Sequence, residues 1–487
     1  MIQEERDRRE RLEAIRAGGT EPYPSTVHRS HTIAETLAQF EDFESEKREI
    51  TLCGRLTAIR RHGGITFLRL KDASAEIQVV LHRDSIGEED YSRFHKQADV
   101  GDFFEFHGGV MVTKNGEQSL LTTSYRILSK TLLPLPEKWH GLTDIEIRYR
   151  QRYLDLLSNP TTMNNAKARS RMLSAMREFL EKEGFTEVET PILQAIPGGA
   201  NAKPFITYHN SLHAEFYLRI APELYLKRLI VGGFEKIFEV ARCFRNEGIS
   251  PQHNPEFTQI EAYFAYANIE MLTNHLEKLF QVAVRAVTGG QLVVTVGGEQ
   301  ISFANIPRQT FHDLILSASE IDLDIVKTEE SLRQALKQKG IFADNIIGYG
   351  ELADHLYKTA VRPKIIQPIF VTDYPSDMKP LAKRRENNLH YSASVQLVVL
   401  GMEMCNAFNE LNDPEEQEMR FREQETLRAR GSEDAQRIDE DYLTALKHGL
   451  PPTAGYGVGI DRLAALLTNS NNLKEVILFP TLKPTEN

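Results

Sequence analysis

Cysteine is scarce in this chain of 487 residues. Its three cysteines, Cys53, Cys243 and Cys405, lie far apart and form no CxxC pair. Cysteines this isolated exclude a disulfide framework and argue against a structural zinc site. We therefore expect the protein to work in a reduced compartment, the cytoplasm.

Long apolar runs are also missing. The N-terminal stretch MIQEERDRRERLEAIRAGG is densely charged and lacks the apolar segment of a secretory signal. No other run approaches membrane-spanning length, so we expect no membrane partner. A content of 41% hydrophobic and 26% charged residues is typical of a soluble globular protein. The net charge of −11 disfavours a protein that wraps nucleic acid, although a local basic face is compatible with it.

Glycine-rich phosphate-binding motifs are absent from the sequence. The chain contains neither GxxxxGK[ST] nor a GxGxxG that follows a predicted strand. The P-loop and Rossmann types of phosphate site are thereby excluded. Any chemistry on a nucleotide would have to use cationic side chains instead.

The order of predicted elements indicates an α+β fold with several domains. Residues 1–45 are expected to form a helical extension. Residues 46–130 predict three strands, a helix and two strands, the order of a small OB-fold β-barrel. A Pro-containing linker is expected at residues 131–147. Residues 148–487 predict a mainly antiparallel sheet flanked by helices, with a helical insertion at about 310–360.

One charged loop, RCFRNEGISPQHNPEF at residues 242–257, connects two predicted strands of that sheet. Its Arg245 is suited to pair with a phosphate, and Phe257 to stack on a base. Arg462, at the start of the last helix, could cover the other face of that base. Taken one at a time, these residues also fit a surface ion pair and a core phenylalanine. The loop by itself therefore leaves both interpretations open.

Three sequence motifs resemble those of class II aminoacyl-tRNA synthetases. GFTEVETPIL is similar to motif 1, FRNEGISPQHNPEFTQIEAYFAY to motif 2 and AGYGVGIDRLAALL to motif 3. The segments PGGANAKPFITYHN, LRIAPELYLKRLIVGGFEKIFEVARCFRNEGIS and LPPTAGYGVGIDR resemble the lysyl-tRNA synthetases of this class in particular, the bacterial type of class IIb. The resemblance covers nearly the whole chain, and motif 2 is its most specific part.

The resemblance implies activation of L-lysine with ATP to lysyl-adenylate, followed by transfer to the 3′ end of tRNA(Lys), with Mg²⁺ accompanying ATP. Arg245 and Arg462 would be catalytic, and the adenine would lie between Phe257 and Arg462. Motif 1, which ends at Pro191, would form a homodimer interface. The residues implied in ATP binding are Arg245, Glu247, His253, Phe257, Glu403 and Arg462.

The resemblance also implies a lysine pocket lined by anions. Glu223, Tyr263 and Glu410 would surround the ε-ammonium group, while Asn406 would contact the carboxylate end. A site built around a charged group rejects analogues without it by roughly 10⁴-fold or more. Without the motif, a carboxylate at a helix N-terminus would be the preferred interpretation of Glu223. The residues implied in lysine binding are Gly199, Glu223, Glu261, Tyr263, Asn406 and Glu410.

The strand pattern of the predicted barrel alone leaves RNA binding and a role as a spacer or dimer contact equally open. The resemblance implies that the barrel reads the anticodon of tRNA(Lys). Phe67 would stack on a base, and Gln78 and Glu117 would contact base edges.

The chain departs from the family in the strands before motif 3. The family has two carboxylates there for magnesium; Glu403 matches one, and Gln396 stands in the place of the other. Glutamine offers an oxygen without a charge, so we expect fewer or weaker protein-bound magnesium ions. Glu403 and Asn406 also have opposite parity in one predicted strand, so a β-bulge is needed if both face the site.

Two alternative functions stay open at this point. One is a paralogue that attaches lysine to a protein, although such relatives lack the N-terminal barrel. The other is a catalytically weakened RNA-binding relic, which Gln396 would fit.

Overall fold

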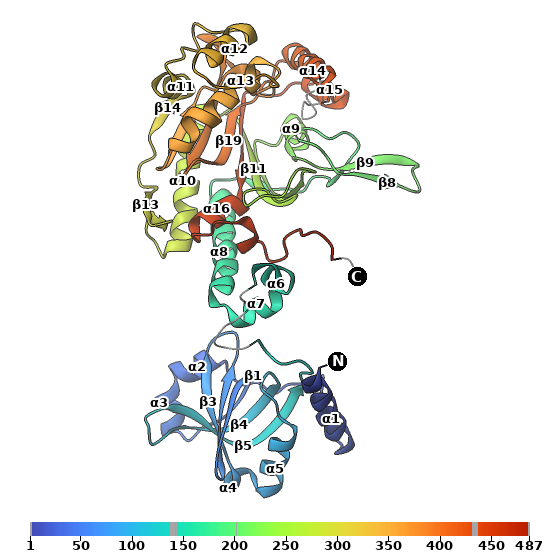
Figure 1. Ribbon diagram of the computed structural model, residues 1–487, viewed down its shortest axis with the longest axis vertical. Coiled ribbons are helices and arrows are strands. Elements are labelled where there is room, and N and C mark those ends of the chain that lie inside the picture. The colour runs from blue at the N-terminus through green and yellow to red at the C-terminus, as the bar shows by residue number, and fades with distance from the viewer. Residues whose placement is uncertain (1, 137–141, 143, 201, 431–436, 486–487) are drawn as a thin grey trace. The chain divides into compact units, whose positions relative to one another are not determined.

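The structure, a computed structural model, describes residues 2–136, 142, 144–200, 202–430 and 437–485 (Figure 1). The chain divides into two compact units, Met1–Gly141 and Leu142–Asn487. Residues 137–141 and 143 of the expected linker lie outside the described residues. No helix in the described segments is both long and apolar enough to span a membrane.

The first unit is a closed five-stranded barrel with the strand order β1-β2-β3-β5-β4. The predicted order of three strands, a helix and two strands is confirmed, except that the helical connection between β3 and β4 consists of two helices. Alternating residues such as Leu52, Leu68 and Val79 point inward and are buried. The elements are α1 (Gln3–Ala17), α2 (Ile33–Ala38), α3 (Phe40–Ser45), β1 (Glu49–His62), β2 (Ile65–Lys71), β3 (Glu76–His82), α4 (Arg83–Ile86), α5 (Glu88–Gln97), β4 (Phe103–Val112) and β5 (Gln118–Ser129).

The second unit is built on an eight-stranded sheet with the order β14-β15-β18-β19-β20-β11-β10-β6. All neighbours in it are antiparallel except the two edge pairs, β14 with β15 and β10 with β6. The predicted α+β class with a mainly antiparallel sheet is thus confirmed. The strands are β6 (Thr186–Glu187), β10 (Lys236–Phe244), β11 (Glu256–Ala265), β14 (Arg308–Thr310), β15 (Ile369–Thr372), β18 (Ser394–Val399), β19 (Met402–Asn409) and β20 (Thr453–Gly459).

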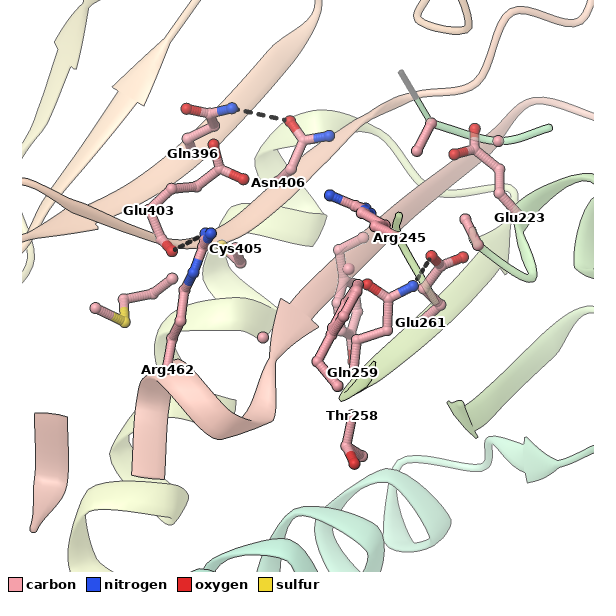
Figure 2. A pocket seen from close by; sticks show the side chains of 18 of the residues that line it. Glu223, Arg245, Thr258, Gln259, Glu261, Gln396, Glu403, Cys405, Asn406 and Arg462 are labelled. Atoms are coloured by element: carbon pink, nitrogen blue, oxygen red, sulfur yellow. Dashed lines mark hydrogen bonds between the residues drawn. The ribbon is translucent and has the colours of Figure 1, made fainter. Parts of the chain in front are cut away.

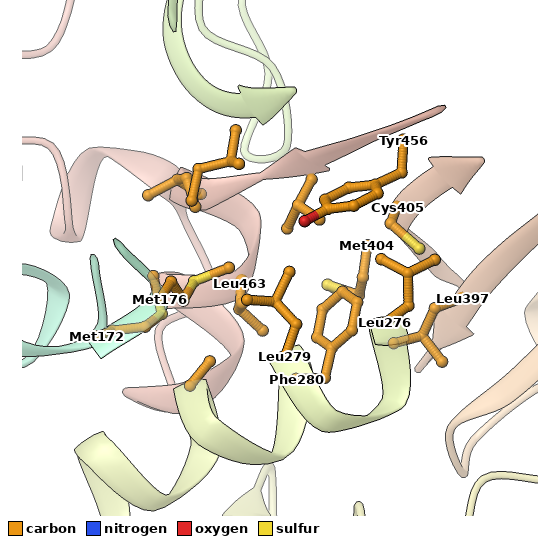
Figure 3. Close-up of a cluster of buried hydrophobic side chains, with 14 of the residues drawn as sticks. Met172, Met176, Leu276, Leu279, Phe280, Leu397, Met404, Cys405, Tyr456 and Leu463 are labelled. Carbon is orange, nitrogen blue, oxygen red and sulfur yellow. The ribbon is translucent and has the colours of Figure 1, made fainter. Parts of the chain in front are cut away.

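Three helices pack on one side of this sheet: α8 (Pro160–Lys182), α10 (Ile269–Thr288) and α16 (Ile460–Leu467). Figure 3 shows the apolar contact between them and the strands, with Leu276, Leu279 and Phe280 of α10 pointing into it. With this side closed by hydrophobic side chains, the polar side chains of β11 and β19 are left to the other side, where β20 presents glycines. The residues of this hydrophobic contact that Figure 3 labels are Met172, Met176, Leu276, Leu279, Phe280, Leu397, Met404, Cys405, Tyr456 and Leu463.

The region predicted as a helical insertion contains helices with a separate hydrophobic core. The remaining helices and the small sheets surround the large sheet (Figure 1). The insertion helices are α11 (Phe311–Ser319), α12 (Glu329–Gln338), α13 (Tyr349–Leu356) and a π-helical turn (Tyr357–Val361). The others are α6 (Ile145–Arg150), α7 (Arg152–Ser158), α9 (Glu223–Val231), α14 (Pro414–Ala429), α15 (Glu440–Lys447) and short 3₁₀ turns at 362–364, 376–378 and 473–475. The small sheets comprise β7 (Leu193–Gln194), β9 (Ala214–Leu218) and β8 (Ile206–His209), then β12 (Val293–Val296) with β13 (Glu299–Ser302), and β16 (Arg384–Arg385) with β17 (Asn388–Ser392).

Candidate active site

A pocket of about 340 Å³ opens on the polar side of the large sheet (Figure 2). Strands β11, β19 and β20, the start of α9, the start of α16 and the loop between β10 and β11 contribute to its wall. Every residue that was predicted for ATP, lysine or magnesium lines this one pocket: Gly199, Glu223, Arg245, Glu247, His253, Phe257, Glu261, Tyr263, Gln396, Glu403, Asn406, Glu410 and Arg462. The roles of these residues stay predictions.

Strand β11 presents a polar row to the pocket because its side chains alternate between the two sides of the sheet. Gln259 Nε2 donates a hydrogen bond to Glu261 Oε1 at 2.5 Å, and Tyr263 Oη donates to Glu261 Oε2 at 3.3 Å. Burial raises the pKa of Glu261, and the charge of Glu223 adds to this rise. The two donors fix the Glu261 carboxylate at the floor of the pocket.

A buried lysine lies among the acidic residues of the pocket, and the sequence analysis missed it. Lys227 Nζ donates to Glu223 Oε1 at 2.6 Å and also contacts Glu410 Oε2. The rings of Phe408 and Tyr442 have their centroids 5.4 and 5.9 Å from the ammonium. Burial opposes its charge, but Glu223 and Glu410 outweigh burial and raise the pKa of Lys227. The spacing of four residues between Glu223 and Lys227 in α9 was the signal in the sequence.

The second oxygen of Glu410, Oε1, is buried without a hydrogen-bond partner among the described residues. It lies against Gly455 of β20, where a Cβ atom would be 2.4 Å from Oε1 and 2.5 Å from Tyr263 Cε1. Burial raises the pKa of Glu410, while Lys227 opposes the shift. Glycine at position 455 therefore lets the Glu410 carboxylate and the Tyr263 ring pack directly against the backbone of β20.

Gly199 is placed in a similar way at the α9 end of the pocket. Its φ of +86° lies in the region that favours glycine, and a Cβ there would be 2.9 Å from Glu223 Cβ. The backbone can approach Glu223 this closely only without a side chain.

The arginines predicted for the nucleotide lie at the other end of the pocket. The Arg245 guanidinium lies 5.0 Å from the centroid of the Phe257 ring, and its Nε is buried without a hydrogen-bond partner in the described residues. Arg462 Nη1 donates to the backbone carbonyl of Glu403 at 3.3 Å (Figure 2). Asp461, beside Arg462, accepts from the backbone N–H of Thr258 at 2.8 Å and so ties α16 to β11.

The loop between β10 and β11 holds the two remaining nucleotide candidates. Glu247 and His253 are both exposed. A ring nitrogen of His253 lies 2.8 Å from Ser250 Oγ. Burial, together with the cations Arg462 and Arg245, lowers the pKa of His253. The histidine therefore lies at the rim of a cationic region.

The expected β-bulge is present in β19. Leu397 pairs with Cys405 and Val398 pairs with Glu403, so Met404 is the extra residue. Because the extra residue reverses the alternation, Glu403 and Asn406 both reach the pocket (Figure 2). One strand thus contributes residues to both ends of the site.

The pair Glu403 and Gln396 does not form a two-carboxylate metal site. Gln396 Oε1 accepts a hydrogen bond from Tyr374 Oη at 2.7 Å, and its Nε2 donates to Asn406 Oδ1 at 3.4 Å. Both ends of the amide are therefore engaged with protein groups, and Glu403 is the single carboxylate of the pair. A magnesium ion prefers several oxygen ligands, carboxylates among them, and this donor set does not fit a magnesium ion held by the protein.

Metal-ligating side chains come together elsewhere in the molecule. In the segments that the structure describes, three of them lie close enough to hold an ion only at His312, Asp322 and Asp324. These residues belong to the insertion and do not line the pocket. The weaker magnesium binding expected from Gln396 therefore stays a prediction that the local hydrogen bonds support.

The three anticodon candidates lie close to one another on the barrel. Gln78 of β3 pairs with Arg69 of β2, and its Nε2 donates to Ser119 Oγ at 2.9 Å. Glu117, just before β5, forms an ion pair of 2.5 Å with Arg69, a residue that the sequence analysis missed. Phe67 is two residues from Arg69 in β2 and therefore lies on the same side of the strand. The group combines a half-buried ring, an amide and an ion pair.

Comparison with known proteins agrees with this geometry. Residues 144–483 match the family "tRNA synthetases class II (D, K and N)", and residues 50–128 match the family "OB-fold nucleic acid binding domain". A protein of Pelotomaculum thermopropionicum named lysine–tRNA ligase is 45% identical over 99% of this chain and 95% of its own length. Proteins of the same name from Dehalococcoides mccartyi, at 45% identity, and Chloroflexus aurantiacus, at 44%, match 98% and 97% of this chain and 97% and 96% of their own lengths. The chain belongs to the class II tRNA synthetases of the D, K and N group.

Proposed function

We propose that the protein is a lysine–tRNA ligase, which activates L-lysine with ATP and transfers it to the 3′ end of tRNA(Lys). The observation that carries the proposal is the unpartnered oxygen of Glu410 in a pocket that also contains Glu223 and Glu261. Lys227 compensates one of these three carboxylates. The charge that is left suits a ligand with an ammonium group at each end of a short chain, as in lysine.

The two ends of the pocket divide the substrates between them. The ε-ammonium of lysine would donate to Glu410 Oε1 beside Tyr263, and the α-amino group would lie near Glu261 and Gly199. ATP would lie at the arginine end, with the adenine between Phe257 and Arg462. A guanidinium such as that of Arg245, with a buried Nε that lacks a partner, is suited to a phosphate oxygen.

The first reaction step follows from this placement. A lysine carboxylate oxygen attacks the α-phosphorus of ATP, an O–P bond forms, and the bond to the leaving pyrophosphate breaks. Arg245 and Arg462 compensate the charge on the phosphates, so the step is promoted by positioning and electrostatics. The 3′-hydroxyl of the tRNA then attacks the carbonyl carbon of lysyl-adenylate and releases AMP.

The partners of the proposed enzyme are tRNA(Lys) and a second copy of the chain. The barrel, with Phe67, Gln78 and Glu117, would read the anticodon in the cytoplasm. Leu193 and Ile206, on the small sheet β7-β9-β8 that follows motif 1, are 47% and 61% exposed, and such apolar residues support a homodimer through this region. The domain limits proposed from the sequence are 1–45, 46–130, 131–147 and 148–487.

Lysine-dependent exchange of pyrophosphate into ATP, followed by charging of tRNA(Lys), tests the function. A lysine–tRNA ligase performs both reactions and prefers lysine to asparagine and aspartate. Exchange without charging of tRNA would favour the alternative in which lysine is attached to a protein. No exchange at all would favour a catalytically weakened RNA-binding protein.

A further inference from the structure

Lys379 lines the pocket, and no role has been assigned to it. It follows the 3₁₀ turn Ser376–Met378 and lines the pocket together with Glu403 and Asn406. Its Nζ donates a hydrogen bond to Asn406 Oδ1 at 2.6 Å and lies 4.9 Å from the centroid of the Tyr374 ring. The partner of this ammonium is thus a neutral amide, which leaves its charge uncompensated by the bond.

The backbone around Lys379 is fixed by hydrogen bonds. Its N–H donates to the carbonyl of Ser376 at 3.0 Å, and its carbonyl accepts from Arg420 Nη1 at 3.2 Å. Arg420 is itself buried and also donates to the Ala382 carbonyl. The ammonium therefore projects into the pocket from a rigid turn.

Gln396 shares the same acceptor with Lys379. Asn406 Oδ1 receives one hydrogen bond from Lys379 Nζ and a longer one from Gln396 Nε2. With its oxygen occupied, Asn406 can offer only its N–H donors to a substrate, which suits a carboxylate. Tyr374 completes the group because its hydroxyl donates to Gln396 Oε1 while its ring faces the ammonium.

The resemblance implies a metal site at the place where these side chains meet: Tyr374, Lys379, Gln396 and Asn406. A carboxylate at position 396 would join Glu403 in attracting a cation, but the amide there carries no charge. The Glu403 carboxylate instead has a lysine ammonium in its neighbourhood: burial lowers the pKa of Lys379, and Glu403 opposes that shift more than any other charge. A cation that is covalently part of the chain therefore already contacts this strand pair, through Asn406.

We propose that Lys379 is a catalytic residue whose ammonium contacts the ATP phosphates at the junction with the lysine carboxylate, replacing a metal ion that residues 396 and 403 would otherwise hold. The inference rests on the proposed function for the identity of its substrates. The proposal also explains Gln396, because a neutral side chain at this position leaves the charge of the Lys379 ammonium available to a phosphate. A carboxylate at that position would form an ion pair with Lys379 instead.

Calorimetric binding of ATP, with and without magnesium, tests the role of Lys379. In excess EDTA, Lys379→Met should weaken ATP binding about tenfold to a hundredfold, the range for hydrogen bonds to charged groups. In saturating magnesium the loss should be clearly smaller, because the metal brought by ATP restores part of the charge. The matched control is Lys383→Met: Lys383 Nζ also donates to an asparagine, Asn412 Oδ1 at 2.9 Å, but neither residue lines the pocket. This control should bind ATP as the unmodified protein does.

Binding of Mn²⁺, followed by electron paramagnetic resonance without nucleotide, tests the replacement itself. Lys379→Met combined with Gln396→Glu should bind Mn²⁺ at least about tenfold more tightly than the unmodified protein, while Gln396→Glu alone should gain less. Equal losses of ATP affinity with and without magnesium, or no gain in Mn²⁺ binding by the double variant, would overturn the proposal. Thermal melting shows whether each variant is folded. If the ATP-binding and Mn²⁺-binding results are as expected but the unmodified protein shows no lysine-dependent exchange, the proposed function alone is wrong.

Discussion

Lys227 Nζ lies 2.6 Å from Glu223 Oε1 and contacts Glu410 as well, so one buried ammonium joins two carboxylates of the proposed lysine pocket. The three groups come from α9 and from the end of β19, which are distant in the sequence. Two carboxylates that line the pocket are thus already bound by a fixed cation of the same chemical kind as the end of the proposed substrate. Lys227 occupies one oxygen of Glu410 and leaves the other one open.

Replacement of Lys227 by methionine should destabilise the protein. Two buried carboxylates would lose their shared cation, and breaking a buried pair in this way costs about 3–5 kcal/mol. The free energy of unfolding in urea measures the effect. Glu410→Gln added to Lys227→Met should recover part of the loss because one uncompensated charge disappears. A change below about 1 kcal/mol in the single variant would show that the ion pairs are not important for stability.

Gly455→Ala should block the proposed lysine site. The new Cβ would fall 2.4 Å from Glu410 Oε1 and 2.5 Å from Tyr263, so one of these groups would have to move. We expect the KM for lysine in pyrophosphate exchange to rise by about a hundredfold or more, the effect of losing a charged contact of roughly 3 kcal/mol.

The matched comparison for this change is Gly457→Ala, two residues further along β20. There a Cβ would meet Glu261 Cγ at 3.5 Å, an ordinary van der Waals distance. Its effect on the KM for lysine should be clearly smaller. Equal effects of the two alanines would mean that the space beside Glu410 is not where the substrate binds.

Phe67→Ala should separate the two proposed reactions. The barrel is a compact unit apart from the pocket, so lysine-dependent exchange should keep its rate. Charging should lose about 1–3 kcal/mol of tRNA binding, the usual value of one stacked base, which appears as a higher KM for tRNA(Lys). A variant that charges normally would exclude Phe67 as a stacking residue.

The stability of the protein should fall as the pH drops from about 6.5 to 4, in part through His275. Burial, with Lys236 and Lys278 nearby, lowers the pKa of His275 from 6.5 to about 4. Its Nε2 lies 3.2 Å from the Tyr456 hydroxyl, and its ring packs between those of Phe179 and Phe185. Since the unfolded chain binds a proton in this window that the folded chain does not, the contribution is complete above pH 6.5 and decreases as the pH falls.

The size of this effect is about 3 kcal/mol, from two to three pKa units at about 1.4 kcal/mol each. Urea unfolding of the protein and of His275→Gln between pH 7 and pH 4.5 measures it, because glutamine does not titrate. The free energy of unfolding should depend less on pH in the variant. Parallel curves for the two proteins would assign the acid sensitivity to other groups.

Much of the pocket could be predicted from the sequence because its residues follow strand periodicity or a recognisable motif. Phe257, Glu261 and Tyr263 alternate in β11 and do face the pocket together. The need for a bulge between Glu403 and Asn406 also followed from the sequence, because the two residues have opposite parity in one strand. Its position at Met404 did not, since a bulge depends on which residues pair across two strands.

Lys227 and Lys379 could not be predicted in the same way. Lys227 lies in a helix with many apolar residues, where a lysine would usually reach the surface, and Glu410, directly after β19, joins Glu223 in compensating its buried charge. Lys379 precedes a proline in an irregular segment with no period to follow. The local spacing indicates only the pair of Lys227 with Glu223; the contacts of Lys227 with Glu410 and of Lys379 with Asn406 join residues far apart in the chain.

The supernumerary residue Met404 gives segment 397–406 a fixed length. Removing or adding one amino acid there would turn either Glu403 or Asn406 toward the hydrophobic side of the sheet. Strand β19 would then no longer contribute residues to both the nucleotide end and the amino-acid end of the pocket. Among homologous sequences, an insertion or deletion in this segment therefore indicates a degenerate copy, and its unchanged length indicates an intact enzyme.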